Sequence, residues 1–268
     1  SLRTLEQLRS RLGAGPESAG MMAIGCRGAP CTGAGARIHP LTGAPLPELT
    51  HAEWEARQVA ALHAGATVLT GRDATEAALR TTDFAGVSLV HVAAHGYADA
   101  DHPERSFIVL EPDCADAADD GLLLWREVAA LDLDASLVVL AACRSADGSL
   151  AVGEGVTGLT QAFLHAGAAC VLAALDDVPD AYAARFMTGF HQCLAGGAPP
   201  AAALRETRAV ARAAGERWGA SFVLVGDGTV PLPVGGPARQ KLGRRGGYLV
   251  ATVLVAALAV AVFLRRRT

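Results

Sequence analysis

From residue 49 onward, the sequence alternates short apolar runs, many of them β-branched, with segments of helical periodicity. Strands that are buried on both faces of a parallel sheet have this continuous apolar character, and the helices that join them cover the sheet. The alternation therefore predicts an α/β fold with a mostly parallel central sheet between two layers of helices. A chain of 268 residues is long enough for one such domain with a well-buried core.

The positions of the expected elements follow from apolar runs, helical spacing and capping signals. Strands are expected over residues 21–25, 66–69, 90–95, 106–110, 137–143, 168–175 and 221–225. Helices are expected over residues 50–63, 73–82, 123–131, 159–165, 182–194 and 200–213. A capping box from Thr50 to Glu53 is expected to open the first of these helices.

Two of the expected strands end on residues that can do chemistry. The apolar run from residue 90 ends at His95-Gly96, and the run from residue 137 ends at Cys143. The carboxyl ends of parallel strands meet at one edge of a sheet, which is where such folds bind ligands. His95 and Cys143 can therefore meet there, and their separation of about 50 residues, with His first, matches the caspase-like spacing.

The residue types at this edge are those that thiol-catalysed peptide cleavage needs. Cys143 would supply the nucleophilic sulfur, and His95 would transfer the proton. The backbone N–H groups of Gly96 and Cys143 are the candidates for the oxyanion hole, because Gly96 has no Cβ to block a substrate carbonyl. The sequence names no third residue that would orient His95. His91 lies inside the apolar run and is expected to be a packed, hydrogen-bonded histidine.

With these motifs, the chain resembles the CHAT peptidases, which are caspase-like, distantly similar to separase, and often follow tetratricopeptide repeats. The resemblance covers roughly residues 20–228 and implies a caspase-like three-layer sandwich. It implies a cysteine endopeptidase that cleaves a specific protein partner, is regulated by an upstream or partner domain, and uses no cofactor and no metal. The matching segments outside the His and Cys motifs are residues 65–69, 74–79, 153–155, 166–168, 174–180, 203–205 and 218–222.

Two departures from the family pattern lie beside the expected substrate cleft. The family usually has Ser-Ala-Cys-Glu-Thr around the nucleophile, whereas this chain has Ala141-Ala142-Cys143-Arg144-Ser145. Asp176 also stands where a Trp is common. These changes leave open a second interpretation, in which the domain is a catalytically inactive caspase-like scaffold or signalling adaptor at the membrane.

An acidic cluster follows the strand that ends near residue 175. Asp176, Asp177 and Asp180 are expected at the catalytic edge, where a carboxylate could bind a basic substrate side chain through a bidentate pair with Arg. The similarity to separase points to Asp180 as the specificity residue, with Asp177 second. The alternative is that Asp180 caps the following helix, where Asp is common.

Other functional classes find less support in the sequence. Residues 153–158 match the GxGxxG pattern of dinucleotide-binding proteins, but about ten residues separate them from the preceding strand, whereas that motif follows its strand directly. A net charge of −4 gives no electrostatic footprint for nucleic acid. The six cysteines have no close pairs with zinc-ligand spacing, which indicates reduced thiols in a cytoplasmic setting.

Regions flanking the domain are interpreted from composition. Residues 1–19 are expected to contain a short amphipathic helix, as a remnant of an upstream region, and residues 229–247 a Gly/Pro-rich linker. Residues 248–264 carry no charge and lie between arginine clusters, which predicts a C-terminal transmembrane helix. The chain is thus expected to be a single-pass membrane protein with its catalytic domain in the cytoplasm. Its Ala- and Gly-rich composition suggests a GC-rich bacterial source.

Overall fold

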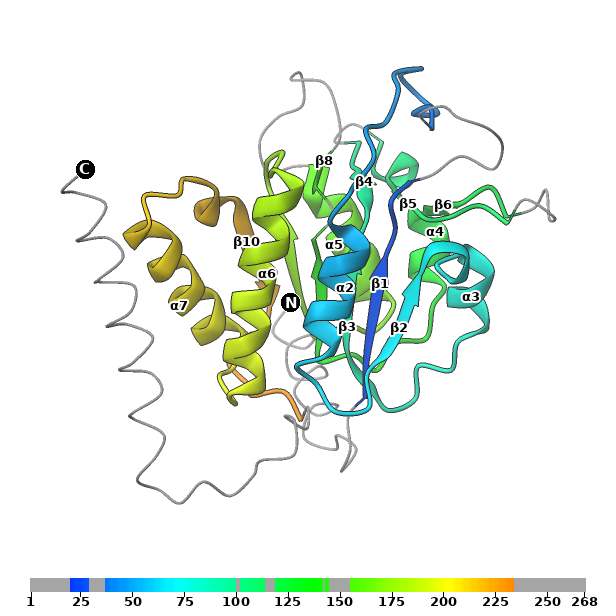
Figure 1. Cartoon of the computed structure of the whole chain (residues 1–268). Coiled ribbons are helices and arrows are strands. Elements are labelled where there is room, and N and C mark those ends of the chain that lie inside the picture. Colours follow the sequence, from blue (N-terminus) through cyan, green and yellow to red (C-terminus); the bar gives the residue numbers. More distant parts are fainter. Residues whose placement is uncertain are drawn as a thin grey trace, which may run out of the picture. The chain divides into compact units, whose positions relative to one another are not determined.

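The computed structural model describes residues 20–28, 37–99, 102–113, 119–141, 143–144 and 155–233. Contacts within the chain separate Ser1–Gly236 from a second unit, Pro237–Thr268, which lies outside these described residues. The first unit is a three-layer α/β sandwich, with one sheet between two groups of helices (Figure 1). This arrangement confirms the α/β class and the mostly parallel sheet.

The central sheet has six strands in the order β10-β9-β7-β3-β1-β2. Its strands are parallel except for β10, which runs antiparallel to β9. The innermost strands β3 and β7 are rich in Val and Leu and almost wholly buried, as strands covered on both faces must be. The strands are β1 (Gly20–Gly25), β2 (Thr67–Thr70), β3 (Val87–Ala93), β7 (Leu137–Leu140), β9 (Cys170–Ala174) and β10 (Phe222–Gly226).

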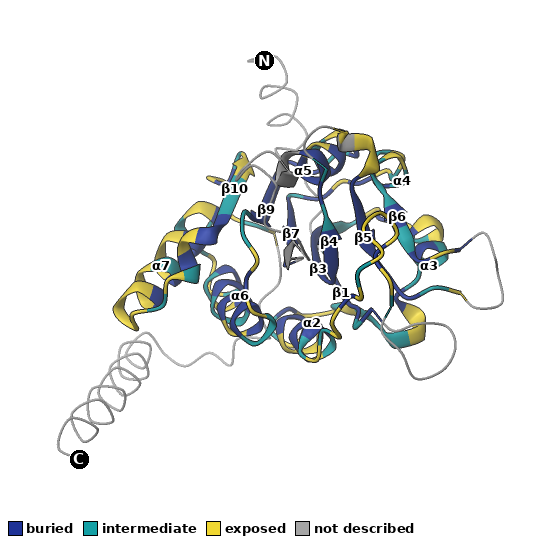
Figure 2. Ribbon diagram, turned by 90° about the horizontal axis from the view of Figure 1, so that it is seen from above, coloured by how far each residue is buried: buried dark blue, intermediate teal, exposed yellow. Residues whose placement is uncertain are grey.

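Helices cover both faces of this sheet, and their buried sides face it (Figure 2). One layer consists of α2 (Ala52–Ala60), α6 (Asp180–Ala195) and α7 (Pro200–Ala213). The other layer consists of α3 (Glu76–Thr81), α4 (Trp125–Ala129) and α5 (Gly155–His165). Three 3₁₀ turns complete the described helical elements: η1 (Gly71–Asp73), η2 (Pro103–Arg105) and η3 (Trp218–Ser221).

Each face of the sheet has its own hydrophobic core. Met187 and Phe190 of α6 pack with Phe222 on one face, and Phe163 of α5 packs with Val138 on the other. Successive strand residues point to opposite faces, so β3 contributes Leu89 and Ala93 to the first core and Val90 and Val92 to the second. These two cores hold the sheet rigidly between the helix layers.

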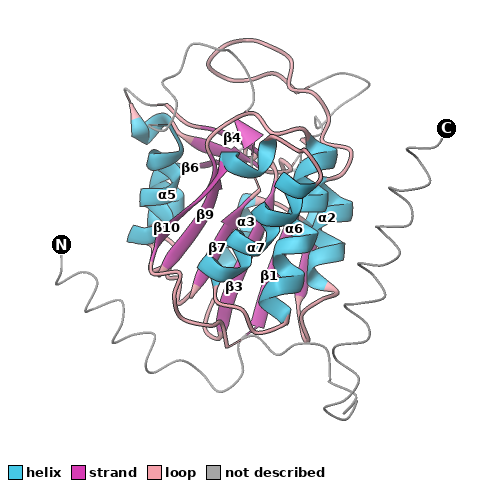
Figure 3. Cartoon of the chain, turned by 90° about the vertical axis from the view of Figure 1, so that its left-hand side faces the viewer, coloured by secondary structure: helices cyan, strands magenta, loops and turns pink. Residues whose placement is uncertain are grey.

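A small second sheet extends the main one beyond the carboxyl ends of its central strands (Figure 3). Its strands are β4 (His95–Tyr97), β5 (Phe107–Val109), β6 (Leu122–Leu124) and β8 (Cys143–Arg144). The strand predicted up to His95 is therefore divided, because the chain leaves β3 after Ala93 and pairs anew in β4. Leu122–Leu124, expected partly as helix, pairs with β5 instead.

The capping prediction for α2 is wrong. The N-cap is His51, and its side chain makes no capping hydrogen bond. By contrast, the Thr75 side chain accepts a hydrogen bond from the Ala78 N–H at the start of α3. The backbone N–H of His51 donates instead to the side chain of Asp180, the first residue of α6.

The predicted membrane location is corrected. Among the described residues, no helix is both long and apolar enough to cross a bilayer. Residues 248–264, on which the prediction of a transmembrane helix was based, lie outside the described residues, as do the predicted helix within residues 1–19 and most of the linker.

Candidate active site

The small sheet brings the backbones of His95 and Cys143 together. Strand β4 follows β3 and strand β8 follows β7, so each of the two residues continues a central strand past its carboxyl end. The two extensions run parallel, with His95 opposite Cys143 and Gly96 opposite Arg144. Neighbouring strands lie about 4.8 Å apart, so this register places the two Cα atoms at adjacent positions.

Two groups that the sequence did not single out hold the ring of His95. Its Nε2 lies 2.6 Å from the backbone oxygen of Pro47, and only a nitrogen that carries hydrogen can donate to a carbonyl. In the neutral imidazole this leaves Nδ1 with the lone pair. Gly28, at a φ of 75°, packs against the ring: a Cβ there would lie 3.2 Å from His95 Cδ2.

The surroundings keep the imidazole of His95 in its neutral form. Burial lowers the pKa of His95, since only 3% of the residue is exposed and a charged ring would lose its hydration. The Pro47 carbonyl and the Asp180 carboxylate oppose this effect, and Arg37 adds to it. A neutral ring with a fixed tautomer is suited to accept a proton.

The three predicted acidic residues have different surroundings. The Ser221 hydroxyl donates to Asp176 at 2.8 Å, so Asp176 is tied to the turn before β10. Asp177 is exposed. Asp180 is the first residue of α6 but does not cap it, because the N-cap is Pro179 and no side-chain cap is present. Instead, Asp180 Oδ2 accepts the backbone N–H of His51 at 2.8 Å.

A buried chain of polar side chains lies in the interior beside this site. His63 Nε2 is 3.1 Å from His191 Nδ1, and His191 Nε2 is 3.1 Å from His91 Nδ1. His91 Nε2 lies 3.0 Å from Glu55 Oε1, and all four residues are buried. The packed, hydrogen-bonded role predicted for His91 is confirmed, and the two side chains that contact its nitrogens, Glu55 and His191, come from α2 and α6. Burial raises the pKa of Glu55 and lowers that of His191.

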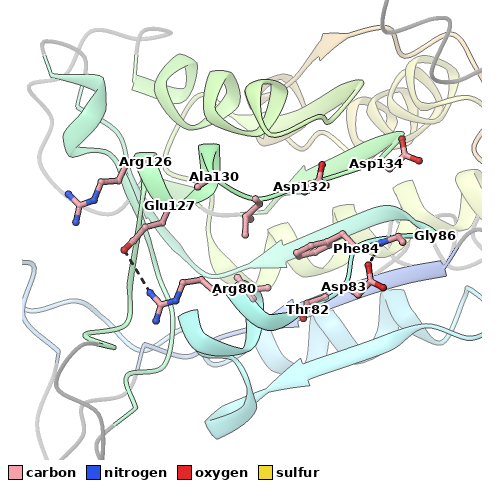
Figure 4. A pocket seen from close by; sticks show the side chains of 13 residues that line it. Arg80, Thr82, Asp83, Phe84, Gly86, Arg126, Glu127, Ala130, Asp132 and Asp134 are labelled. Carbon is pink, nitrogen blue, oxygen red and sulfur yellow. Dashed lines mark hydrogen bonds and ion pairs between the residues drawn. The ribbon is translucent and has the colours of Figure 1, made fainter.

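A large groove on the described surface lies elsewhere. It holds about 830 Å³ and is formed at the amino ends of β3 and β7, opposite the end that carries His95. Figure 4 shows Phe84 between a side that bears Thr82 and Asp83 and a side that bears Asp132 and Asp134. The groove therefore does not belong to the His95 site. Within the described ranges, no group of three or more His, Cys, Asp or Glu side chains is placed to hold a metal ion.

Comparison with known proteins adds a family and two relatives. A family model described as the CHAT domain matches residues 3–227. Tetratricopeptide repeat protein 28 of Mus musculus is 36% identical to this chain over 110 residues, and that of Homo sapiens is 37% identical over 110 residues. The match covers 39% of this chain but 4% of each relative's length. The bacterial source suggested by composition is not shown, since both of these relatives are mammalian.

Proposed function

Because the chain belongs to the CHAT domain family, we propose that it is a cysteine endopeptidase in which Cys143 is the nucleophile and His95 transfers the proton. The observation that carries the proposal is the pairing of β4 with β8, which sets His95 opposite Cys143. The Pro47 carbonyl supports it further, because it fixes the imidazole in the tautomer that can accept a proton at Nδ1.

The proposed reaction proceeds through an acyl-enzyme. His95 Nδ1 takes the proton of the Cys143 thiol, and the sulfur adds to the carbonyl carbon of the scissile peptide bond. The backbone N–H groups of Gly96 and Cys143 donate to the oxyanion as it forms. The protonated Nδ1 then gives its proton to the leaving amine, the C–N bond breaks, and water hydrolyses the thioester with His95 again taking the proton. The reaction needs no cofactor.

The acidic residues after β9 support a preference for a basic side chain in the substrate. Asp177 is exposed, so we assign the contact with substrate chiefly to this residue, with Asp180 and Asp176 flanking it. A carboxylate in this position can bind an Arg guanidinium in a bidentate geometry. The substrate is proposed to be a specific protein, and the activity to be controlled by a partner domain, such as the repeats that the relatives' name describes.

The test is cleavage of a peptide library by the full chain, with the activating partner supplied where one is found. Cys143→Ala is expected to abolish cleavage, and His95→Ala to reduce it by about 10²- to 10⁴-fold, which is the usual contribution of a general base. Cys193→Ala and His102→Ala serve as matched controls, since Cys193 is a free thiol distant in sequence and His102 is exposed. Cleavage that survives Cys143→Ala would contradict the proposal and favour the scaffold interpretation.

A further inference from the structure

The carboxylate of Asp180 joins the start of α6 to the start of α2. Its Oδ2 accepts the backbone N–H of His51 at 2.8 Å and lies 3.0 Å from His51 Nδ1 and 3.5 Å from Thr50 Oγ1. Asp180 thus bonds the N-cap residue of α2, whose own side chain makes no capping hydrogen bond. A negative charge at this position also interacts favourably with the amino end of the helix dipole.

The chain that Asp180 holds is the same segment that orients His95. Only three residues separate His51 from Pro47, whose carbonyl accepts the hydrogen bond from His95 Nε2. Backbone hydrogen bonds hold the segment on either side of Pro47: Leu46 N–H donates to Arg37 O at 2.6 Å, and Leu49 N–H donates to Arg27 O at 3.2 Å. Arg27 also pairs with Glu48 at 3.1 Å, so Asp180 is one of two charged groups that hold this segment.

The position of Asp180 also gives it an electrostatic effect on the imidazole. Its charge favours the protonated ring of His95, whereas burial and Arg37 favour the neutral ring. Among the described side chains, His39 also interacts with His95, and His51 contacts Asp180. The titratable residue Cys143 lies opposite His95 in the neighbouring strand. Asp180 is largely shielded, since 22% of its side chain is exposed, so its charge is only partly screened by water.

We propose that Asp180 is a positioning residue: by holding His51, it fixes the Pro47 carbonyl that orients His95. This role rests on the proposed function and departs from the specificity role expected from the sequence. In this role Asp180 helps to set the orientation and the protonation of His95, and contact with substrate is assigned to Asp177. The same carboxylate cannot easily serve as the floor of a substrate pocket, because its Oδ2 is already occupied by His51.

The proposal is tested by NMR titration of His95 in the full chain, with its signals assigned by comparison with His95→Gln. Asp180→Asn keeps an oxygen acceptor for the His51 N–H but removes the charge, and Asp177→Asn is the matched control on the same loop. We expect Asp180→Asn to lower the titration midpoint of His95 by about 0.5 to 1 pH unit, the size of effect of one partly shielded neighbouring charge. Asp177→Asn is expected to leave the midpoint unchanged.

A second variant and a second readout guard against loss of folding. Asp180→Ser is also uncharged and keeps a hydroxyl acceptor, so the same lowered midpoint is expected in whichever variant folds. The ¹⁵N shifts of the ring should show hydrogen on Nε2 in the parent and a mixture of tautomers in the variants. A midpoint and tautomer equal to those of the parent in a folded Asp180 variant would overturn the proposal.

This titration is independent of peptide cleavage, so the two proposals can fail separately. An inactive Cys143 with a His95 that responds to Asp180→Asn would refute the peptidase but retain the positioning role. An active peptidase whose His95 ignores Asp180→Asn, and whose preference for basic side chains is lost instead, would restore Asp180 to the substrate pocket.

Discussion

Replacement of His63 by Gln should make the protein markedly more resistant to acid. His63 is 4% exposed, and its Nε2 contacts His191 at the outer end of the buried chain that runs through His91 to Glu55. Burial, with a smaller contribution from His91, lowers the pKa of His63 from 6.5 to about 4. The glutamine amide can still donate to His191 but does not titrate in this range.

The size of the effect follows from linkage between protonation and folding. Between about pH 6.5 and pH 4 the unfolded chain binds a proton at His63 that the folded chain does not, so the stability contributed by this residue falls as the pH falls. With 1.36 kcal/mol per pKa unit, the loss between pH 7 and pH 4.5 is about 2 kcal/mol. Glu76 acts in the opposite direction, since burial, Asp119 and Glu127 raise its pKa to about 7, but it acts equally in parent and variant.

The assay is urea denaturation of the parent and His63→Gln at several pH values between about 4.5 and 7.5. As the pH is lowered across this range, the free energy of unfolding of the parent should fall by about 2 kcal/mol relative to that of the variant. His102→Asn, which replaces an exposed histidine, is the matched control. Parallel curves for parent and His63→Gln would refute the reasoning that the buried chain excludes protons.

Three further substitutions probe packing and charge. Gly167→Ala should destabilise the protein by more than about 3 kcal/mol in denaturation. Gly167 has a φ of 117°, and a Cβ at this position would lie 1.9 Å from Leu133 O. Gly65→Ala, whose Cβ would have no atom within 4 Å, should cost about 1 kcal/mol. Phe190→Ala, which empties a fully buried site, should cost about 3 to 5 kcal/mol, and a change at the exposed Val210 less than about 0.5 kcal/mol. Glu76→Gln should gain stability relative to the parent as the pH rises from about 4.5 to about 7, because in this range the unfolded parent has released the proton that folded Glu76 keeps. Equal pH curves would contradict this.

The parts of the fold that depend on local pattern could be predicted from sequence. The predicted helix over residues 200–213 coincides with α7, because Pro at the first helical position and a run of good helix formers define it locally. The direction of β10 and the formation of β6 could not be predicted, because they depend on which strand each segment pairs with. Similarly, the N-cap of α2 is His51, and its N–H donates to Asp180, about 130 residues away in the chain, which local sequence could not reveal.

The candidate site was predictable to a similar extent. Apolar runs that end on His95 and Cys143 indicated that both residues lie at the same sheet edge, and the pairing of β4 with β8 sets their backbones side by side. Pro47 and Gly28 could not be identified, because they lie in a Gly/Pro-rich region with no periodicity and contact His95 only in the folded chain. The partner of Asp180 was missed for the same reason.

The most direct test of the account is to label the full chain with an electrophilic peptide probe that carries an Arg side chain, and to locate the adduct by mass spectrometry. The account predicts a single dominant adduct on Cys143, slowed by about 10²-fold or more in His95→Ala and unchanged in Cys193→Ala. Labelling of Cys143 at the same rate with and without the His95 imidazole, or labelling confined to other cysteines, would show that these two residues are not a catalytic pair.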